Sequence, residues 1–165
     1  MHLEELSIEH ETVFLQMVST FGQVWTSAQF LNYVKDCAKQ RQDWRPKAGK
    51  ISQTHYLLRE GQGPLLAKGV MRFPLDPVTE IDGGNLWCEV PPPLRGQGYG
   101  SYCLALMLFE AVRAGLRRAL VTAPAADLAA RRMIEKNRGQ LLDEVFSTVP
   151  EREKILIARY WINFS

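Results

Sequence analysis

Hydrophobic positions follow a helical period at the start of this chain and a strand-like pattern further on. After a short strand over His2–Leu6, two helices are predicted, the first over 8–21 behind Ser7 and the second behind Ser27. Their apolar residues recur every three or four positions: Val13, Phe14, Met17, Val18 and Phe21 in the first helix, and Phe30, Leu31, Val34 and Ala38 in the second. Each helix therefore has one face to bury.

The polar segment Gln40–Lys50 contains Pro46 and Gly49 and is predicted to be a loop. Six further strands are predicted after it: Thr54–Arg59, Leu65–Phe73, Asn85–Val90, Arg118–Thr122, Gln140–Phe146 and Ile155–Phe164. The first two of these six are joined by the short turn Gly61–Pro64. A connection of that length predicts that they pair antiparallel.

Two more helices alternate with the later strands. Apolar side chains cover most of the circumference of the first, at about Gly98–Ala114, and Gly115 is placed to end it; the second is predicted over Asp127–Asn137. A strand–helix–strand unit between antiparallel pairs predicts an α/β (α+β) fold with a mixed, mostly antiparallel central sheet of six to seven strands flanked by helices. Residues 1–165 show no repeat and no long linker, which predicts a single domain.

Composition narrows the classes of protein and partner. Hydrophobic residues make up 46% and charged residues 23% of the chain, as in ordinary globular proteins, and the formal net charge of +2 is too small to favour nucleic-acid binding. Three cysteines without a Cys-x-x-Cys pair disfavour a disulfide framework or a metal site. The acidic segment Met1–Leu6 does not look like a signal peptide, and no apolar run is long enough for a membrane, so a cytoplasmic protein is expected.

Glycine alternates at positions 96, 98 and 100, between the strand that stops at Pro91–Pro93 and the long helix. Without Cβ atoms the main chain is open to a ligand, and the free N–H groups at a helix start favour an anion such as phosphate. Arg95 adds a full positive charge. A Walker A loop needs a lysine that is absent here, and the glycine spacing departs from the dinucleotide fingerprint. From the glycines alone, an anion site and a plain loop are equally open.

The segment Arg95-x-x-Gly98-x-Gly100 resembles the Arg/Gln-x-x-Gly-x-Gly/Ala signature of the GNAT (Gcn5-related) N-acetyltransferases. Met133–Gly139 is similar to the end of the following helix in that family. Gly83-Gly84 and Arg159–Ile162 resemble a bacterial branch of predicted GNAT acetyltransferases. The likeness extends over most of the chain and is most specific around the glycines.

The resemblance implies the GNAT-like acyl-CoA N-acyltransferase fold and acetyl-CoA (coenzyme A) as co-substrate, without a metal. In that fold the strands at Asn85–Val90 and Arg118–Thr122 splay apart, and the pantetheine arm enters between them. The implied cofactor-binding residues are Cys88 and Val90 along pantetheine, and Arg95, Gly96, Gln97, Gly98, Tyr99, Gly100, Ser101 and Asp127 around the pyrophosphate. The implied reaction acetylates a primary amine of a small molecule or peptide by direct attack in a ternary complex, and the family also suggests a homodimer.

Departures from the family pattern leave a second class open. Asp127 and Ala130 stand where this branch often has an asparagine and a serine, and Arg138 replaces a glycine. Met133 and Ile134 occupy the stretch of helix in which many members carry a tyrosine that protonates the leaving thiolate. An acyl-CoA-binding module with weak or no catalysis is therefore the alternative to an enzyme.

The side chains that move protons are the least determined by the sequence. Glu89 lies on the strand before the glycines and is the candidate general base, although a carboxylate on a sheet face also pairs with a cation such as Arg72. Tyr160 on the last strand is the candidate acid, although packing beside Trp161 is the other interpretation. Neither role follows from spacing alone.

Other polar and aromatic groups have two interpretations each. His55 titrates near neutrality, but a histidine on a strand is more often structural or exposed. Cys88 and Cys103 are expected to be small buried apolar groups. The aromatic residues of the first third either form the wall of the acceptor site or pack the helices onto the sheet: Trp25, Phe30, Tyr33 and Trp44.

Overall fold

Seven strands form one mixed sheet in the computed structural model, which describes residues 1–41 and 51–164. The order across the sheet is β1-β2-β3-β4-β5-β7-β6, and only β4 and β5 are parallel neighbours. The strands are β1 (His2–Glu5), β2 (Ser52–Arg59), β3 (Leu65–Phe73), β4 (Leu86–Glu89), β5 (Arg118–Pro124), β6 (Gln140–Phe146) and β7 (Leu156–Asn163). The predicted mixed, mostly antiparallel sheet is confirmed.

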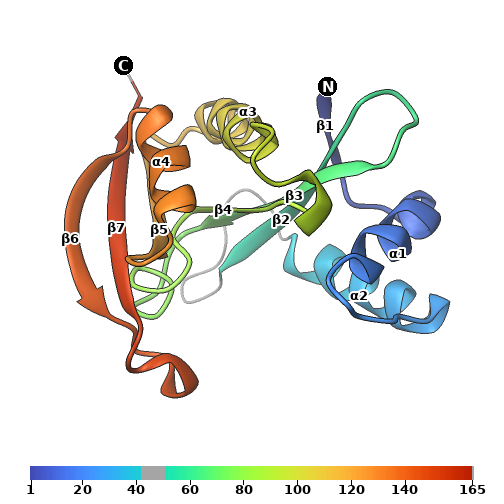
Figure 1. Cartoon of the computed structure of the whole chain (residues 1–165), viewed down its shortest axis with the longest axis horizontal. Helices are drawn as coiled ribbons and strands as arrows, with labels where there is room; N and C mark the ends of the chain where they lie inside the picture. The colour runs from blue at the N-terminus through green and yellow to red at the C-terminus, as the bar shows by residue number, and fades with distance from the viewer. Residues whose placement is uncertain (42–50, 165) are drawn as a thin grey trace.

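Helices cover both faces of the sheet. They are α1 (Glu11–Ser19), α2 (Ser27–Gln40), α3 (Tyr99–Arg113) and α4 (Leu128–Lys136), with short 3-10 turns η1 (Ile8–His10), η2 (Pro92–Leu94) and η3 (Pro150–Arg152). Figure 1 shows α3 and α4 on one side of the sheet and α1 and α2 on the other, next to β1 and β2. We call these two sides the α3 face and the α2 face.

Each face has its own hydrophobic core. Leu58 points to the α3 face and packs with Leu104 and Met107 of α3, whereas its neighbour Leu57 points to the α2 face and packs with Phe14 and others. All of these side chains are almost fully buried. Successive residues of a strand point to opposite faces, so β2 serves both cores. Burying each such side chain contributes about 1.5–3 kcal/mol.

The boundaries differ from the predicted ones mainly at the N-terminal helices. The predicted helix over 8–21 is split into η1 and α1. Thr26, one residue before the predicted cap, begins α2 in a capping box with Gln29. Gln40, predicted to lie in a loop, is the last residue of α2, and the remainder of that predicted loop at 42–50 lies outside the described residues. None of the described helices is long and apolar enough to cross a membrane.

Candidate functional site

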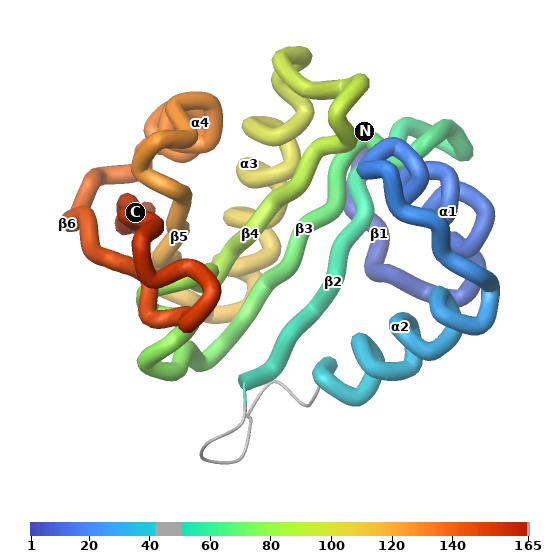
Figure 2. The backbone as a smooth tube through the Cα atoms, turned by 60° about the horizontal axis from the view of Figure 1, so that its bottom comes forward, coloured from blue at the N-terminus to red at the C-terminus, as the bar shows by residue number. Residues whose placement is uncertain are grey.

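Within the described residues, the parallel pairing of β4 with β5 is confined to the first residue of β4 and the middle of β5. Their parallel register joins Leu86 to Val121, and Gly84 bridges the same valine. Beyond that point 87–89 stay paired with β3, while 122–124 stay paired with β7. Figure 2 shows β4 turning away from β5 toward the loop that precedes α3. The predicted splay is therefore present, and the separated strand edges are able to pair with an extended chain.

The loop between β4 and α3 is exposed main chain. Gly96 and Gly98 have φ angles of +76° and +89°, a region that residues with a Cβ rarely adopt. Gly98 is also the N-cap residue of α3. A Cβ built at either glycine would meet no atom within 4 Å. Glycine is thus required by the course of the backbone, and the space beside it is open to a ligand.

The main-chain N–H groups of this loop have no partners within the described protein. From Gly96 through Ser101 none donates to another group of residues 1–41 or 51–164. The first to join the helix is the N–H of Tyr102, which donates to the carbonyl of Gly98 at 3.1 Å. Free N–H groups at a helix start carry the positive end of its dipole, about half an elementary charge. Their clustering suits a phosphate group.

The end of α4 holds the first turn of α3 in place. Asn137 Nδ2 donates to the carbonyl of Ser101 at 3.1 Å and to that of Met133 at 2.9 Å. A Cβ added to Gly100 would lie 2.9 Å from Met133 Sδ, so this third glycine allows the two helices to approach. Arg138, which replaces a glycine of the family pattern, has the left-handed φ of +66° that glycine favours.

Side chains around the loop mostly contact its own main chain. Arg95 Nε donates to the carbonyl of Val90 at 3.2 Å, and Gln97 Nε2 donates to a carbonyl of η2 at 3.3 Å. Asp127 caps α4, as its Oδ1 accepts from the N–H of Ala130 at 3.0 Å. A contact of Asp127 with a cofactor remains a prediction.

Cys88 points to the α3 face, away from the side where Glu89 lies. Its thiol donates to Met107 Sδ at 3.5 Å. Hydrogen bonding with Cys103, together with burial, raises the pKa of the Cys88 thiol well above its ordinary value. Cys103 is completely buried. Both behave as the small apolar groups expected from the sequence, and an uncharged thiol is a poor nucleophile.

Glu89 lies on the α2 face beside a lysine. Lys68 Nζ is 3.3 Å from Glu89 Oε2 and 5.4 Å from the centre of the Trp87 ring. The cation that pairs with Glu89 is therefore Lys68 and not Arg72. The Glu89 side chain is 31% exposed, so its carboxylate remains accessible to a molecule on this face.

Aromatic rings and a histidine cover the β2 side of the same face. Trp25 and Tyr33 have ring centroids 5.4 Å apart, and Phe30 is completely buried, so packing accounts for much of this cluster. The Tyr33 hydroxyl lies 3.1 Å from His55 Nδ1. Burial, then the charges of nearby cations, lowers the pKa of His55 to about 4. The ring is therefore neutral near pH 7. Trp44 lies outside the described residues.

A family model described as "Acetyltransferase (GNAT) family" matches residues 22–140, which is most of the chain. This chain belongs to the GNAT acetyltransferase family. It is thus an acetyl-CoA-dependent acetyltransferase by descent, and the resemblance noted at the glycine motif is confirmed. No curated protein matches the sequence.

Solved GNAT structures share the fold at low sequence identity. The ribosomal alpha-N-protein acetyltransferase RimL in complex with coenzyme A is 13% identical with a TM-score of 0.74, covering 98% of this chain and 93% of that one. A mutant of spermidine N-acetyltransferase SpeG from Vibrio cholerae is 12% identical (TM-score 0.67; 99% and 95% covered). The acetyltransferase yncA from Salmonella typhimurium with acetyl-CoA is 10% identical (TM-score 0.66; 99% and 93% covered). These likenesses establish the GNAT fold.

Tyr160 of this GNAT enzyme is completely buried on the α3 face. Its hydroxyl accepts a hydrogen bond from Arg131 Nε at 2.8 Å and donates one to Glu135 Oε1 at 3.2 Å. Burial raises the pKa of Tyr160. Both partners belong to α4, so the hydroxyl joins β7 to that helix. Its predicted role as the acid remains a prediction.

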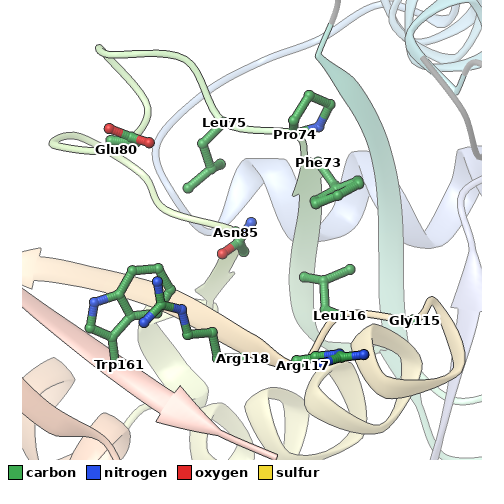
Figure 3. Close-up of a pocket in the computed structure, with 10 residues that line it drawn as sticks. All are labelled: Phe73, Pro74, Leu75, Glu80, Asn85, Gly115, Leu116, Arg117, Arg118 and Trp161. Carbon is green, nitrogen blue, oxygen red and sulfur yellow. The ribbon is translucent and has the colours of Figure 1, made fainter.

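A concavity lies at the opposite end of β4 from the glycine loop (Figure 3). It has a volume of about 390 Å³, and Arg118 lies 4.0 Å from the Trp161 ring on one side of it. Its lining residues are Phe73, Pro74, Leu75, Glu80, Asn85, Gly115, Leu116, Arg117, Arg118 and Trp161. Because the free N–H groups lie at the other end of β4, this pocket is separate from the glycine loop of the GNAT site.

Sequence reasoning missed several contacts of the site. Asn137 was noted within a family motif, but its bonds to α3 were not anticipated. The ion pair of Glu89 with Lys68 and the bond between Tyr33 and His55 join residues far apart in the chain. Alternation along β3 and β4 places Lys68 and Glu89 on one face only once their register is known.

Proposed function

We propose that this protein transfers the acetyl group of acetyl-CoA to a primary amine by direct attack in a ternary complex. The observation that carries the proposal is the strand edge freed where β4 leaves β5, which leads directly into the unpartnered N–H groups of Gly96–Ser101. Acetyl-CoA would supply the acetyl group as a thioester. Family membership and the neighbours solved with coenzyme A or acetyl-CoA support this assignment.

The residues present fit that co-substrate. The N–H groups of Gly96–Ser101 would hold the doubly charged diphosphate, with the Arg95 guanidinium beside them. The free edge of β4 from Cys88 to Val90 would pair with the amide groups of pantetheine as an added strand. Main-chain N–H groups of the same strand would stabilise the negative charge that develops on the reacting oxygen. We place Tyr99 and Asp127 at the border of this site.

Glu89 is our candidate for the base. An amine must lose a proton to complete the attack, and a carboxylate accepts it directly or through water. Glu89 lies one residue from both Cys88 and Val90, but on the α2 face, so the amine would approach from that side. No tyrosine of α4 takes the place of an acid, and the Tyr160 hydroxyl is bonded to Arg131 and Glu135. We assign the acid to no side chain.

Acceptors in the neighbours include spermidine and a ribosomal protein, according to their names. We propose an amine of a small molecule or peptide here as well. We also propose that the protein is cytoplasmic and forms a homodimer. The reason for the dimer is that the edge strand β6 exposes the apolar residues Leu141, Leu142 and Phe146. Light scattering on the purified protein checks this, since a monomer mass at micromolar concentration contradicts the dimer.

Two measurements test the function. Calorimetric titration with coenzyme A is expected to show binding, and the absence of heat at millimolar ligand with folded protein contradicts the proposal. Thiol release from acetyl-CoA across a panel of amines then separates an enzyme from the binding module that Asp127, Ala130 and the missing tyrosine suggest. Tight cofactor binding without turnover on any amine supports the module.

A further inference from the structure

The α2 face contains a cation without a counter-ion. Arg72 Nε donates to Gln53 Oε1 at 3.0 Å, but its Nη1 is buried and has no hydrogen-bond partner. Among the described residues no carboxylate lies within 4.0 Å of this guanidinium, whereas Lys68 and Arg159, which lie on the same face of the sheet, each have one. A buried charge that lacks a partner is costly, so the position calls for an explanation.

A second unpartnered atom lies on the neighbouring strand. His55 pairs with Val70 and Gln53 pairs with Arg72, so His55 and Arg72 are diagonal neighbours on the same face, within reach of each other's long side chains. His55 Nε2 is buried and has no hydrogen-bond partner. Two buried, unpartnered polar atoms therefore belong to diagonal neighbours on adjacent strands, and Arg72 Nη1 lies near Gly83, whose added Cβ would be 3.2 Å from it.

The tautomer of His55 sets the role of the second atom. A neutral imidazole has one N–H donor and one bare nitrogen. When the Tyr33 hydroxyl donates to His55 Nδ1, the ring proton lies on Nε2, which then becomes a donor. The N–H groups of His55 and Arg72 are in that case both directed to the α2 face. An oxygen anion between them would accept from both.

We infer that the acceptor carries a carboxylate as well as its amine, bound by Arg72 Nη1 and His55 Nε2. This inference rests on the proposed function and adds the acceptor's chemical class. One uncompensated guanidinium beside a neutral ring is balanced by a single negative charge, which favours a carboxylate over a doubly charged phosphate.

The register gives the direction of the acceptor. Across β3 and β4, Lys68 pairs with Glu89, Val70 with Trp87, and Arg72 is hydrogen-bonded to Asn85. Lys68 and Arg72 are four residues apart, which is about 13 Å along a strand. An acceptor with its amine at Glu89 and its carboxylate at Arg72 would thus cross the Trp87 ring. Amino acids with several bonds between the two groups fit this distance better than α-amino acids.

The test compares each acid with its own primary amide. Acetylation rates would be measured for the wild-type protein, Arg72→Met and His55→Phe. The acceptors would be glycine, 4-aminobutanoate, 6-aminohexanoate and phenylalanine, each compared with its own amide. We expect kcat/KM to be about 10- to 100-fold higher for the preferred acid than for its amide, as hydrogen bonds to a charged group imply. Arg72→Met should abolish that preference and leave the amide within about twofold. Arg118→Met, which removes an arginine that stacks on Trp161 and lies on β5, two strands away from Arg72, should retain the preference.

A binding measurement keeps the inference separate from the proposed function. Coenzyme A affinity, measured for each variant, reports on the function and should not change. In the complex with coenzyme A, the His55 ring signals in NMR should shift on addition of N-acetyl-6-aminohexanoate and not of its amide. Equal use of acids and amides, equal losses for both in Arg72→Met, or no shift of His55 with the acid would each overturn the inference. The ratio of kcat/KM for 2-aminoethyl phosphate to that for ethanolamine would be measured as well. If this ratio exceeds the acid-to-amide ratio of every carboxylate, the choice of a carboxylate as the anion is overturned.

Discussion

The two sides that we propose for this acetyltransferase site are built in opposite ways. The proposed coenzyme A side consists of main-chain N–H groups from one contiguous segment, Gly96–Ser101, and of a strand edge directly before it. The proposed acceptor side consists of side chains from four elements, namely Tyr33 of α2, His55 of β2, Arg72 of β3 and Glu89 of β4. Main-chain recognition depends on local backbone shape, whereas side-chain recognition depends on the whole sheet.

This difference sets how strongly each side depends on single side chains. A diphosphate site made of N–H groups tolerates many side chains, provided that glycine permits the backbone geometry. An acceptor site changes with single substitutions on any of its strands. We therefore expect variants of the two sides to separate cofactor affinity from turnover.

The largest expected effect is on turnover, in Glu89→Gln. Loss of a proton acceptor reduces kcat by about 10²- to 10⁴-fold, while coenzyme A affinity should stay within about twofold because the diphosphate site is intact. Steady-state thiol release and calorimetry measure the two quantities. Glu110→Gln, which breaks a surface ion pair with Arg113 on α3, is the matched control. An unchanged kcat in Glu89→Gln would contradict the role of Glu89 as the general base.

The next effect is on affinity, in Gly98→Val. A β-branched residue at φ +89° forces the loop into another shape and disperses its N–H groups, so we expect coenzyme A to bind about 100-fold more weakly. Gly22→Val is the control, since Gly22 has a similar φ of +74° and equally open surroundings far from the loop. Both variants should lose about 1–2 kcal/mol of stability, but only Gly98→Val should lose affinity. Equal affinity in the two would refute the role of the loop.

The coenzyme A side was largely predictable from the sequence for the same physical reason. Strand, prolines, alternating glycines and helix are consecutive, and each has a local backbone meaning, so the loop and a helix start near Gly98 were anticipated, whereas the splay was implied by the resemblance to the GNAT family. Even the limits of β3 and β6 agree with the prediction, because a turn precedes β3, a loop with prolines follows it, and β6 begins shortly after the end of α4. The split of the first helix was not anticipated, because apolar spacing does not distinguish a 3-10 turn from an α-helix.

The acceptor side was not predictable to the same degree. Which cation pairs with Glu89 depends on the register of β3 against β4, and the sequence offered Arg72 as readily as Lys68. The approach of Tyr33 to His55 depends on how α2 lies across β2. Tyr160 was predicted to act on the substrate, yet its contacts with Arg131 and Glu135 follow from the docking of α4 on β7. Tertiary packing decides each of these.

A smaller effect concerns stability at acidic pH. Burial, aided by the charges of Lys68 and Arg72, lowers the pKa of His55 from 6.5 to about 4. Between these values the unfolded chain binds a proton that the native ring resists, so this contribution is complete above pH 6.5 and is lost as the pH falls toward 4. We expect about 1–2 kcal/mol, allowing for the partial exposure of the ring.

Urea unfolding at pH 4.5 and 7 checks this for the wild type and His55→Phe. The free energy of unfolding should fall less in the variant between the two pH values, because the phenyl ring does not titrate. Ionisable groups common to both proteins cancel in the comparison. The same pH dependence in both would mean that the His55 ring is not shielded by the acceptor side.

A stability effect of similar size, with the smallest change in turnover, is expected in Tyr160→Phe. Loss of the hydroxyl leaves Arg131 and Glu135 without their shared partner, which should cost about 1–2 kcal/mol of stability and change kcat by no more than about threefold. Thermal unfolding and thiol release measure both. A decrease of kcat beyond about 100-fold at unchanged cofactor affinity would instead support the predicted acid role.

The central claim is that main-chain N–H groups of Gly96–Ser101 bind the diphosphate of coenzyme A. Amide chemical shifts of a ¹⁵N-labelled sample test it most directly, with coenzyme A compared against pantetheine, which lacks the diphosphate. The account predicts large downfield shifts of these amides with coenzyme A and little change with pantetheine. Saturating coenzyme A that leaves the amides of Gly96–Ser101 unmoved would contradict it.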